Sequence, residues 1–492
     1  MSLNPVSLNS VLRSRLGDLV AATAATHHCP TVSWAVTIDG AVVESGAHGL
    51  LADGRTPSVD TVYRIASMTK SFTAATVLAL RDEGQLSLDD RIADLAPELA
   101  AITGPTADAA PITVRHLLSM AGGMANDDAW ADRHLDISTA EIDALYRAGA
   151  VFACPTGTAF EYSNLGYAML GRIVQCVTGQ RLQDQVTNRF LGPLGLDRTT
   201  WVRRGHDDWA QPFHVVDKTA QPDPLDPLGD GELAAMGGLW SSAADVCRWM
   251  AWLDDATPAQ DGPDDGPLRR SSRRELQQVQ RYSGRKELNG RIAPTGYGFG
   301  LMVRDDDLLG QVVAHSGGLP GYGSNMRWLA GRHTGVVALA NVTYAPMTEL
   351  TMQMLEAVHE QALHEHGVAP PVGQQSAAHL EPLARQLAAV LTTWAADPAA
   401  AVAPSGNGLA ANEVFADNVA VDEPYPRRAA AAAAALAPLG SVELGAITAT
   451  SAAAGRFTLA STHRDTSVAV TFELAPTMPL RIQSYTVGAL RR

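Results

Sequence analysis

Strand patterns stand at both ends of the first 365 residues of this chain, and helical patterns fill the stretch between them. The first pattern is a hairpin over residues 31–45, centred on Asp39-Gly40, a dipeptide typical of tight turns between antiparallel strands. Strand patterns return much later, at 297–303, 312–315, 325–328 and 335–340. Strands at both ends with helices between them predict one mixed domain over residues 1–365, with a helical insertion at about 85–205.

A second, smaller domain is predicted after a linker. Residues 366–378 (HGVAPPVGQQSAA) are rich in Pro, Gly and small residues, as interdomain linkers are. A helical pattern at 380–395 and an alanine run at 429–437 then precede alternating strands at 440–489. Residues 379–492 are therefore expected to form an accessory α+β domain.

Composition excludes several classes of partner. The formal net charge of −15 argues against nucleic acid and anionic membrane surfaces as partners. No apolar run approaches the roughly 18 residues of a membrane span. The N-terminal residues show no apolar stretch followed by a cleavage site, so a cytoplasmic protein is expected.

Cofactor and disulfide motifs are also missing from the sequence. The four cysteines form no CxxC pair and are too sparse for a disulfide scaffold. Neither HExxH nor a paired HxH spacing occurs, and there is no GxGxxG or phosphate-binding loop. The sequence therefore predicts no metal and no cofactor.

Lysine is rare, which draws attention to Lys70, one of only three in the chain. It lies three residues after Ser67 in Ser67-Met68-Thr69-Lys70, at the start of a helix predicted over 67–83. Residues at this spacing share a helix face, so the amine can reach the hydroxyl and activate it as a nucleophile. A helix start also presents free N–H groups that can hold an oxyanion. An SxxK on its own is common by chance on surface helices.

Two further motifs carry groups suited to the same chemistry. Tyr162-Ser163-Asn164 offers a phenol that can pass a proton and a carboxamide that can orient a lysine. Its structural alternative is an aromatic residue packed at the start of the next helix. His315-Ser316-Gly317-Gly318 ends a predicted strand, where glycines allow a substrate to lie against the strand edge. Its alternative is a strand-end histidine followed by an ordinary turn.

The three motifs in this order resemble those of the serine β-lactamase and penicillin-binding-protein-like family. The resemblance is to the branch that contains class C β-lactamases, D-aminopeptidases and esterases, and it covers roughly residues 10–365. It implies an α/β (α+β) β-lactamase/transpeptidase-like fold, in which helices flank an antiparallel sheet. For residues 379–492 the order of elements resembles a ketosteroid-isomerase-like cone, whereas some relatives carry a lipocalin-like barrel there.

The resemblance also implies roles for individual residues. Ser67 would be the acylated nucleophile, Lys70 its general base and Tyr162 the relay of a proton to the leaving group. Asn164 would orient Lys70 and bind the acyl side chain. The backbone N–H groups of Ser67 and Gly318 would form the oxyanion hole.

The sequence departs from the family pattern at His315, where penicillin-recognising members carry a lysine that faces the substrate carboxylate. A largely neutral histidine favours an esterase, amidase or aminopeptidase over a dedicated β-lactamase. Ser316 and Gly317 are expected beside it in the substrate site. Asp128 and Trp130 lie in an acidic loop that is predicted to form either the pocket rim or a solvated capping loop.

The sequence therefore predicts a serine acyl hydrolase that acts through a covalent acyl-enzyme on an ester, an amide or a D-amino-acid peptide. A true β-lactamase or an acyltransferase of the same fold is the alternative within enzymes. A non-catalytic penicillin-binding or sensor protein is the alternative from another class. The expected partner is a small molecule or short peptide, and the C-terminal domain is a candidate surface for homo-oligomer formation.

Overall fold

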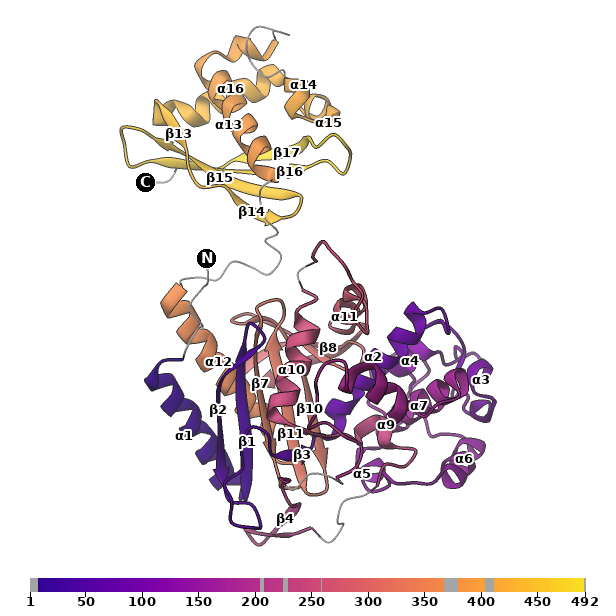
Figure 1. Cartoon of the computed structure of the whole chain (residues 1–492). Coiled ribbons are helices and arrows are strands. Elements are labelled where there is room, and N and C mark those ends of the chain that lie inside the picture. The colour runs from indigo at the N-terminus through magenta and orange to yellow at the C-terminus, as the bar shows by residue number, and fades with distance from the viewer. Residues whose placement is uncertain are drawn as a thin grey trace. The chain divides into compact units, whose positions relative to one another are not determined.

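The structure is a computed structural model that describes residues 8–203, 208–223, 229–257, 259–366, 379–402 and 411–490. The chain divides into two compact units, Met1–Ala369 and Pro370–Arg492, which we describe separately (Figure 1). The predicted linker at 366–378 lies, apart from its first residue, outside the described residues.

An eight-stranded antiparallel sheet forms the centre of the first unit, in the order β2-β1-β12-β11-β10-β9-β8-β7. The second and third strands of this order come from opposite ends of the unit, because β1 (Thr31–Ile38) pairs with β12 (Thr334–Ala340) from Val32 to Ile38. The other strands are β2 (Ala41–Gly49), β7 (Arg281–Leu288), β8 (Arg291–Tyr297), β9 (Met302–Asp306), β10 (Gly310–Leu319) and β11 (Tyr322–Leu329). The predicted antiparallel sheet flanked by helices is confirmed.

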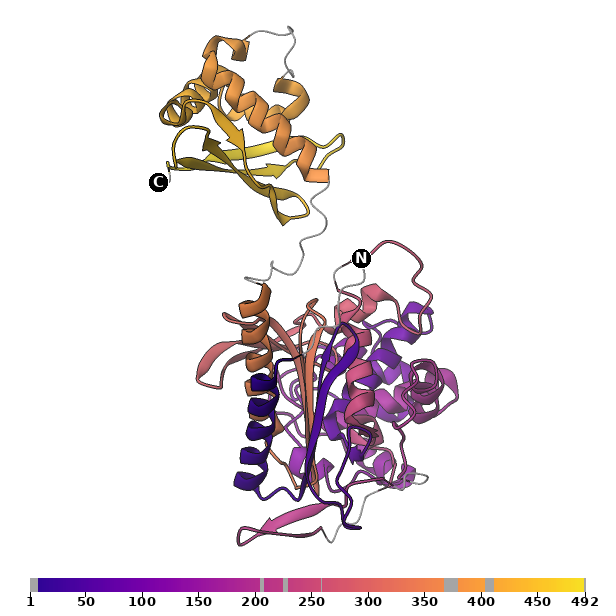
Figure 2. The same cartoon turned by 60° about the vertical axis from the view of Figure 1, so that its left-hand side comes forward.

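Helices cover both faces of this sheet. On one face α1 (Ser10–His27) packs beside α12 (Met347–His366), as Figure 2 shows. The buried residues of α1 recur every fourth position, at Leu12, Leu16, Val20 and Ala24, so a single apolar stripe faces the sheet. The larger hydrophobic core lies on the other face, between the sheet and the remaining helices.

The helices of the second face include the predicted insertion. They are α2 (Thr69–Asp82), α3 (Ile92–Leu95), α4 (Val114–Leu118), α5 (Asp128–Ala131), α6 (Thr139–Ala148), α7 (Asn164–Thr178), α8 (Leu182–Val186), α9 (Ala234–Gly237), α10 (Ala243–Asp254) and α11 (Arg270–Leu276). Two small sheets pair β3 (Val62–Arg64) with β6 (Trp240–Ser242) and β4 (Phe213–Val216) with β5 (Thr219–Pro222).

The prediction of one strand over 297–303 is wrong. The chain turns at Gly300, so that β8 ends before the turn and β9 begins after it. Gly300 has a φ of +71°, and a Cβ there would lie 2.5 Å from the Lys70 carbonyl oxygen, so the turn requires glycine. The strand predicted to end at His315 continues to Leu319 as β10, because its glycines are extended and pair with β11.

The second unit holds a five-stranded antiparallel sheet packed with helices, consistent with the predicted α+β class. Its helices are α13 (Leu380–Ala396), α14 (Ala411–Val414), α15 (Asp417–Asp422) and α16 (Tyr425–Leu436). Its strands are β13 (Val442–Leu444), β14 (Thr448–Ser451), β15 (Ala454–Ser461), β16 (Ser467–Leu474) and β17 (Ile482–Val487). Among the described residues β13 and β17 do not pair with each other, so the sheet is open and is not the lipocalin-like barrel. The ketosteroid-isomerase-like cone stays a prediction for this unit.

Within the described ranges, no helix combines the length and the apolar character needed to cross a membrane.

The two units have separate hydrophobic cores, which makes their independence testable. We expect a chain truncated after Ala369 to stay soluble, to unfold cooperatively and to melt within a few degrees of the first unit in the full-length protein. Differential scanning calorimetry of the two proteins measures this. An insoluble or non-cooperative product would show instead that the first unit depends on the second for its core.

Candidate active site

Ser67 lies in a short 3-10 turn, Ala66–Met68, that joins β3 to the start of α2. The preceding Ala66 has a φ of +49°, a left-handed conformation that costs energy in any residue except glycine. Ser67 itself is 8% exposed, whereas the helix that follows is buried almost throughout. The turn therefore presents one hydroxyl at the surface of an otherwise closed core.

Lys70 places its amine in direct contact with that hydroxyl. Its Nζ donates to Ser67 Oγ at 2.9 Å, to Asn164 Oδ1 at 2.7 Å and to the Met236 carbonyl oxygen at 2.7 Å. These three bonds use all three donors of an ammonium group. The spacing of one helical turn predicted the first contact, and the motifs placed Asn164, but no motif pointed to the backbone of α9.

Burial tunes the basicity of this amine. Lys70 is fully buried, and desolvation lowers its pKa to about 8, although Asp132, Asp128 and Asp127 act in the opposite direction. At that pKa about a tenth of the amine is neutral at pH 7. Lys70 can therefore accept a proton from Ser67 under ordinary conditions.

Tyr162 completes the group around the hydroxyl. Its ring centroid lies 5.0 Å from Lys70 Nζ, and its interaction with the Ser67 side chain partly offsets the effect of burial on its pKa. Burial raises the pKa of Tyr162 well above 10, so the phenol stays neutral and can both donate and accept a hydrogen bond.

The acidic loop holds Asn164 in place. Asp128 Oδ1 accepts from Asn164 Nδ2 at 2.8 Å, and the Asp127 carboxylate accepts from the backbone N–H groups of Asn164 at 2.7 Å and Leu165 at 2.8 Å. These last two N–H groups lie at the start of α7 and have no partner within the helix. Asp128, predicted for substrate, is thus engaged with Asn164, while Trp130 is 37% exposed and stacks on His134.

His315 is buried and neutral. Its Nε2 lies 3.1 Å from the Tyr297 hydroxyl and its Nδ1 lies 2.6 Å from the Ser316 carbonyl oxygen. Because the carbonyl can only accept, we assign the proton to Nδ1 and the Tyr297 hydroxyl as donor to Nε2. Burial and the nearby charge of Lys70 lower the pKa of His315 to about 3. The position therefore carries no cation at physiological pH.

The glycines of β10 bring a free strand edge to the serine turn. Pairing of β10 with β9 stops at Ala314, whereas pairing with β11 continues to Leu319. A Cβ on Gly317 would collide with the Ile65 carbonyl oxygen and press on Ala66, so only glycine allows this approach. Gly318 follows on the same edge, where a Cβ would lie 2.5 Å from the Tyr344 ring.

One contact of the site could not be predicted from the sequence motifs. The Tyr344 hydroxyl donates to Asp132 Oδ2 at 2.9 Å and so joins the loop after β12 to the acidic loop. Tyr344 has a φ of +53°, a strained conformation for a bulky residue. Burial raises the pKa of Asp132 to about 7. Asp132 belongs to the same acidic segment as Asp127 and Asp128, but its partner comes from a segment that carries no motif.

In the part of the chain that the structure describes, no group of three His, Cys, Asp or Glu side chains is arranged to hold a metal ion.

Comparison with known protein families gives a match that spans the residues of this site. The chain matches the family model described as Beta-lactamase over residues 16–359. It is 32% identical over 305 residues to penicillin-binding protein 4 of Amycolatopsis lactamdurans, covering 60% of this chain and 74% of that protein. It is 28% identical over 367 residues to esterase EstB of Burkholderia gladioli, covering 65% and 88%. Its match to the D-alanyl-D-alanine-carboxypeptidase/endopeptidase AmpH of Escherichia coli K12 is 28% identical and spans 44% of this chain and 55% of AmpH.

Solved structures share the fold. The octameric penicillin-binding protein homologue from Pyrococcus abyssi superposes with a TM-score of 0.59 at 20% identity, covering 98% of this chain and 100% of that chain. A D-stereospecific amidohydrolase from Streptomyces sp. superposes with a TM-score of 0.55 at 21% identity, covering 74% and 100%.

The two bonds from Asp127 to the start of α7 predict a stability cost for their removal. We expect Asp127→Ala to lower the free energy of unfolding by about 1–2 kcal/mol, because two helix-terminal N–H groups lose their acceptor. Urea unfolding of the first unit measures it. Asp136→Ala, which removes an exposed carboxylate from the same region, is the control and should change stability by less than about 0.5 kcal/mol. Equal effects of the two substitutions would contradict the capping role.

Proposed function

The chain belongs to the beta-lactamase family, and from this premise we propose that it is a serine acyl hydrolase with Ser67 as its nucleophile. The observation that carries the proposal is the 2.9 Å contact between Lys70 Nζ and Ser67 Oγ, made by an amine whose pKa burial lowers to about 8. A serine hydroxyl needs such a base to attack a carbonyl carbon.

The proposed reaction proceeds through a covalent acyl-enzyme. Neutral Lys70 takes the proton of Ser67 as Oγ bonds to the substrate carbonyl carbon, and the N–H groups of Ser67 and Gly318 hold the oxyanion. The tetrahedral intermediate then expels the alcohol or amine, which receives a proton through Tyr162. Water, deprotonated by the same groups, attacks the acyl-enzyme and releases the carboxylic acid, and Ser67 regains its proton.

Esters, amides and D-amino-acid peptides are the proposed substrates. His315 is neutral and has both ring nitrogens engaged, so it offers no fixed cation to the carboxylate of a penicillin. Asn164 is buried and held between Lys70 and Asp128, which supports its role in orienting the base; contact of its second amide hydrogen with the acyl side chain is part of the proposal. The names of EstB, AmpH and the D-stereospecific amidohydrolase support this range of substrates.

Two alternative functions would use the same catalytic residues. A true β-lactamase or an acyltransferase would use the same acyl-enzyme and differ in the substrate or in the acceptor of the acyl group. A penicillin-binding or sensor protein would acylate without turnover or would not acylate at all. The complete set of contacts among Ser67, Lys70 and Asn164 favours a working catalyst.

The second unit is proposed as a surface for homo-oligomer formation. The Pyrococcus abyssi homologue is described as octameric, and its match covers nearly the whole of this chain.

Covalent labelling tests the nucleophile. A fluorophosphonate probe should label the wild-type protein at Ser67, and Ser67→Ala should lose the label together with at least about a thousandfold in the hydrolysis of p-nitrophenyl butyrate. Intact-mass spectrometry and absorbance assays measure the two effects. Ser71→Ala, one turn further along α2, is the matched control and should keep the label. Retained labelling in Ser67→Ala would refute the assignment, and faster turnover of nitrocefin than of the ester would favour the β-lactamase.

The pH dependence tests the base. Activity should rise as pH passes the pKa of Lys70, because only the neutral amine accepts a proton. Asp132 raises that pKa by its charge, so Asp132→Asn should lower it and move the ascending limb of kcat/KM to lower pH. Asp136→Asn, which removes an exposed charge, should leave the limb in place. A limb that stays fixed or moves to higher pH in Asp132→Asn would contradict Lys70 as the base.

A further inference from the structure

A cavity of about 200 Å³ lies against the strand that carries the glycines, on the side of the sheet covered by α12. Its wall is mostly apolar and includes Leu288, Met302, Val312 and Ala314. Ser316 also lines it. Neighbouring residues of a strand point to opposite faces, so Ser316 faces away from the side on which His315 meets Tyr297. None of Ser67, Lys70 and Tyr162 lines this cavity.

Arg327 of β11 brings a buried charge to the cavity wall. The residue is 3% exposed, and its contacts are long: Nε to Thr351 Oγ1 at 3.5 Å, Nη2 to the Thr348 carbonyl oxygen at 3.5 Å and Nη1 to Met352 Sδ at 3.6 Å. Among the described residues no carboxylate lies within ion-pair distance of this guanidinium. Burying a cation without a close anion is costly, so the site favours an anionic ligand.

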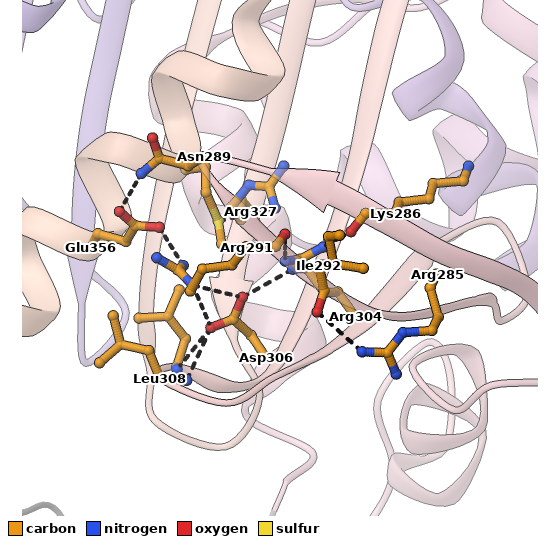
Figure 3. Close-up of polar contacts among 12 residues, drawn as sticks. Arg285, Lys286, Asn289, Arg291, Ile292, Arg304, Asp306, Leu308, Arg327 and Glu356 are labelled. Atoms are coloured by element: carbon orange, nitrogen blue, oxygen red, sulfur yellow. Dashed lines mark hydrogen bonds and ion pairs between the residues drawn. The ribbon is translucent and has the colours of Figure 1, made fainter.

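The carboxylates nearest to Arg327 are already committed to other cations (Figure 3). Asp306 accepts from Arg304 Nε at 3.0 Å and from Arg291 Nε at 3.3 Å. Glu356 accepts from Arg291 and from Asn289. Burial lowers the pKa of Arg327 to about 10, which leaves it protonated at neutral pH.

Lys286 places a second cation on the wall of the cavity. It is exposed on β7, and its Nζ also lies 5.9 Å from the Phe160 ring. The adjacent Glu287 also lines the cavity and is exposed. The hydroxyl side chains of Thr295, Ser316 and Thr348 supply further polar groups. The cavity wall therefore carries three cationic side chains, Lys286, Arg304 and Arg327, of which Arg304 is already paired with Asp306, together with an apolar part of modest size.

We propose that this cavity binds a short monocarboxylate, with the carboxylate on Arg327, Lys286 adding positive charge elsewhere on the wall, and the hydrocarbon against the apolar wall. Its volume falls below the range of about 300–1,000 Å³ that drug-sized ligands occupy, which limits the occupant to a small acid. A guanidinium can hold a carboxylate through two parallel hydrogen bonds. Such an acid can be the product of an acyl hydrolase or a separate metabolite, and the site needs no catalysis to bind either.

Calorimetric titration of the full-length Ser67→Ala protein with hexanoate tests the proposal without turnover. Hexanoate should bind with one-to-one stoichiometry, and hexanamide, which has the same shape without the charge, should bind at least tenfold more weakly. Wild-type protein whose Ser67 carries a bulky phosphonate should bind hexanoate equally well, because the cavity is separate from the nucleophile. Absence of hexanoate binding, equal binding of hexanamide, or loss of binding after phosphonylation would each overturn the proposal.

Variants place the ligand in the cavity. Lys286→Ala changes an exposed residue and should weaken hexanoate binding by about two- to fivefold, as expected for a solvent-facing ion pair. Arg285→Ala, the exposed neighbour that does not line the cavity, is the matched control and should leave the affinity unchanged. Arg327→Met should weaken binding at least tenfold while the protein keeps its unfolding transition. Equal effects of the Lys286 and Arg285 substitutions would overturn the assignment, whether or not Arg327→Met folds.

A last measurement separates the two sources of the acid. If the acid is the product, the acyl chain length that the enzyme hydrolyses fastest among p-nitrophenyl esters should match the chain length of the monocarboxylate that binds most tightly to the Ser67→Ala protein. A mismatch between the two chain lengths would identify the bound acid as a separate metabolite.

Discussion

The burial of one amine organises the site. Lys70 loses its hydration entirely, and three acceptors from three different parts of the chain replace that water: the side chains of Ser67 and Asn164 and a backbone carbonyl of α9. A buried ammonium without these acceptors would be strongly destabilising. The turn before α2, the start of α7 and the position of α9 are therefore fixed relative to one another by the need to satisfy a single group.

The carboxylates around this amine set its working range. Asp127, Asp128 and Asp132 lie near enough to raise the pKa of Lys70, but each is itself engaged, with the start of α7, with Asn164 and with Tyr344 respectively. The loop thus has a structural and an electrostatic effect at once. The effect of desolvation on the pKa of Lys70 still outweighs the effect of these carboxylates. The pKa therefore stays close to the value that proton transfer at neutral pH requires.

The sequence was enough to predict features that depend on local periodicity. It did not predict features that depend on contacts between residues far apart in the chain. The turn from Ser67 to Lys70 follows from helix geometry, and the sheet follows from strands at both ends of the domain. The break at Gly300 was missed, and the contact that requires glycine there comes from the Lys70 carbonyl, which is remote in sequence. The same limit hid the Met236 carbonyl and the partnership of Tyr344 with Asp132, since neither a backbone group nor an isolated tyrosine forms a motif. Asp128 was predicted to lie at the pocket rim or in a solvated capping loop, and the structure shows that it begins α5 and accepts from Asn164.

Because lysine is scarce, the burial of each lysine decides where amine-directed reagents can modify the folded protein. Lys70 is sealed in the core, whereas Lys218 and Lys286 are exposed, so amine-directed reagents meet only two lysine side chains on the folded surface. One of these, Lys286, lines the apolar cavity beside β10. Immobilising the protein on an amine-reactive support would therefore fix it in few orientations, and one of them would turn that cavity toward the support.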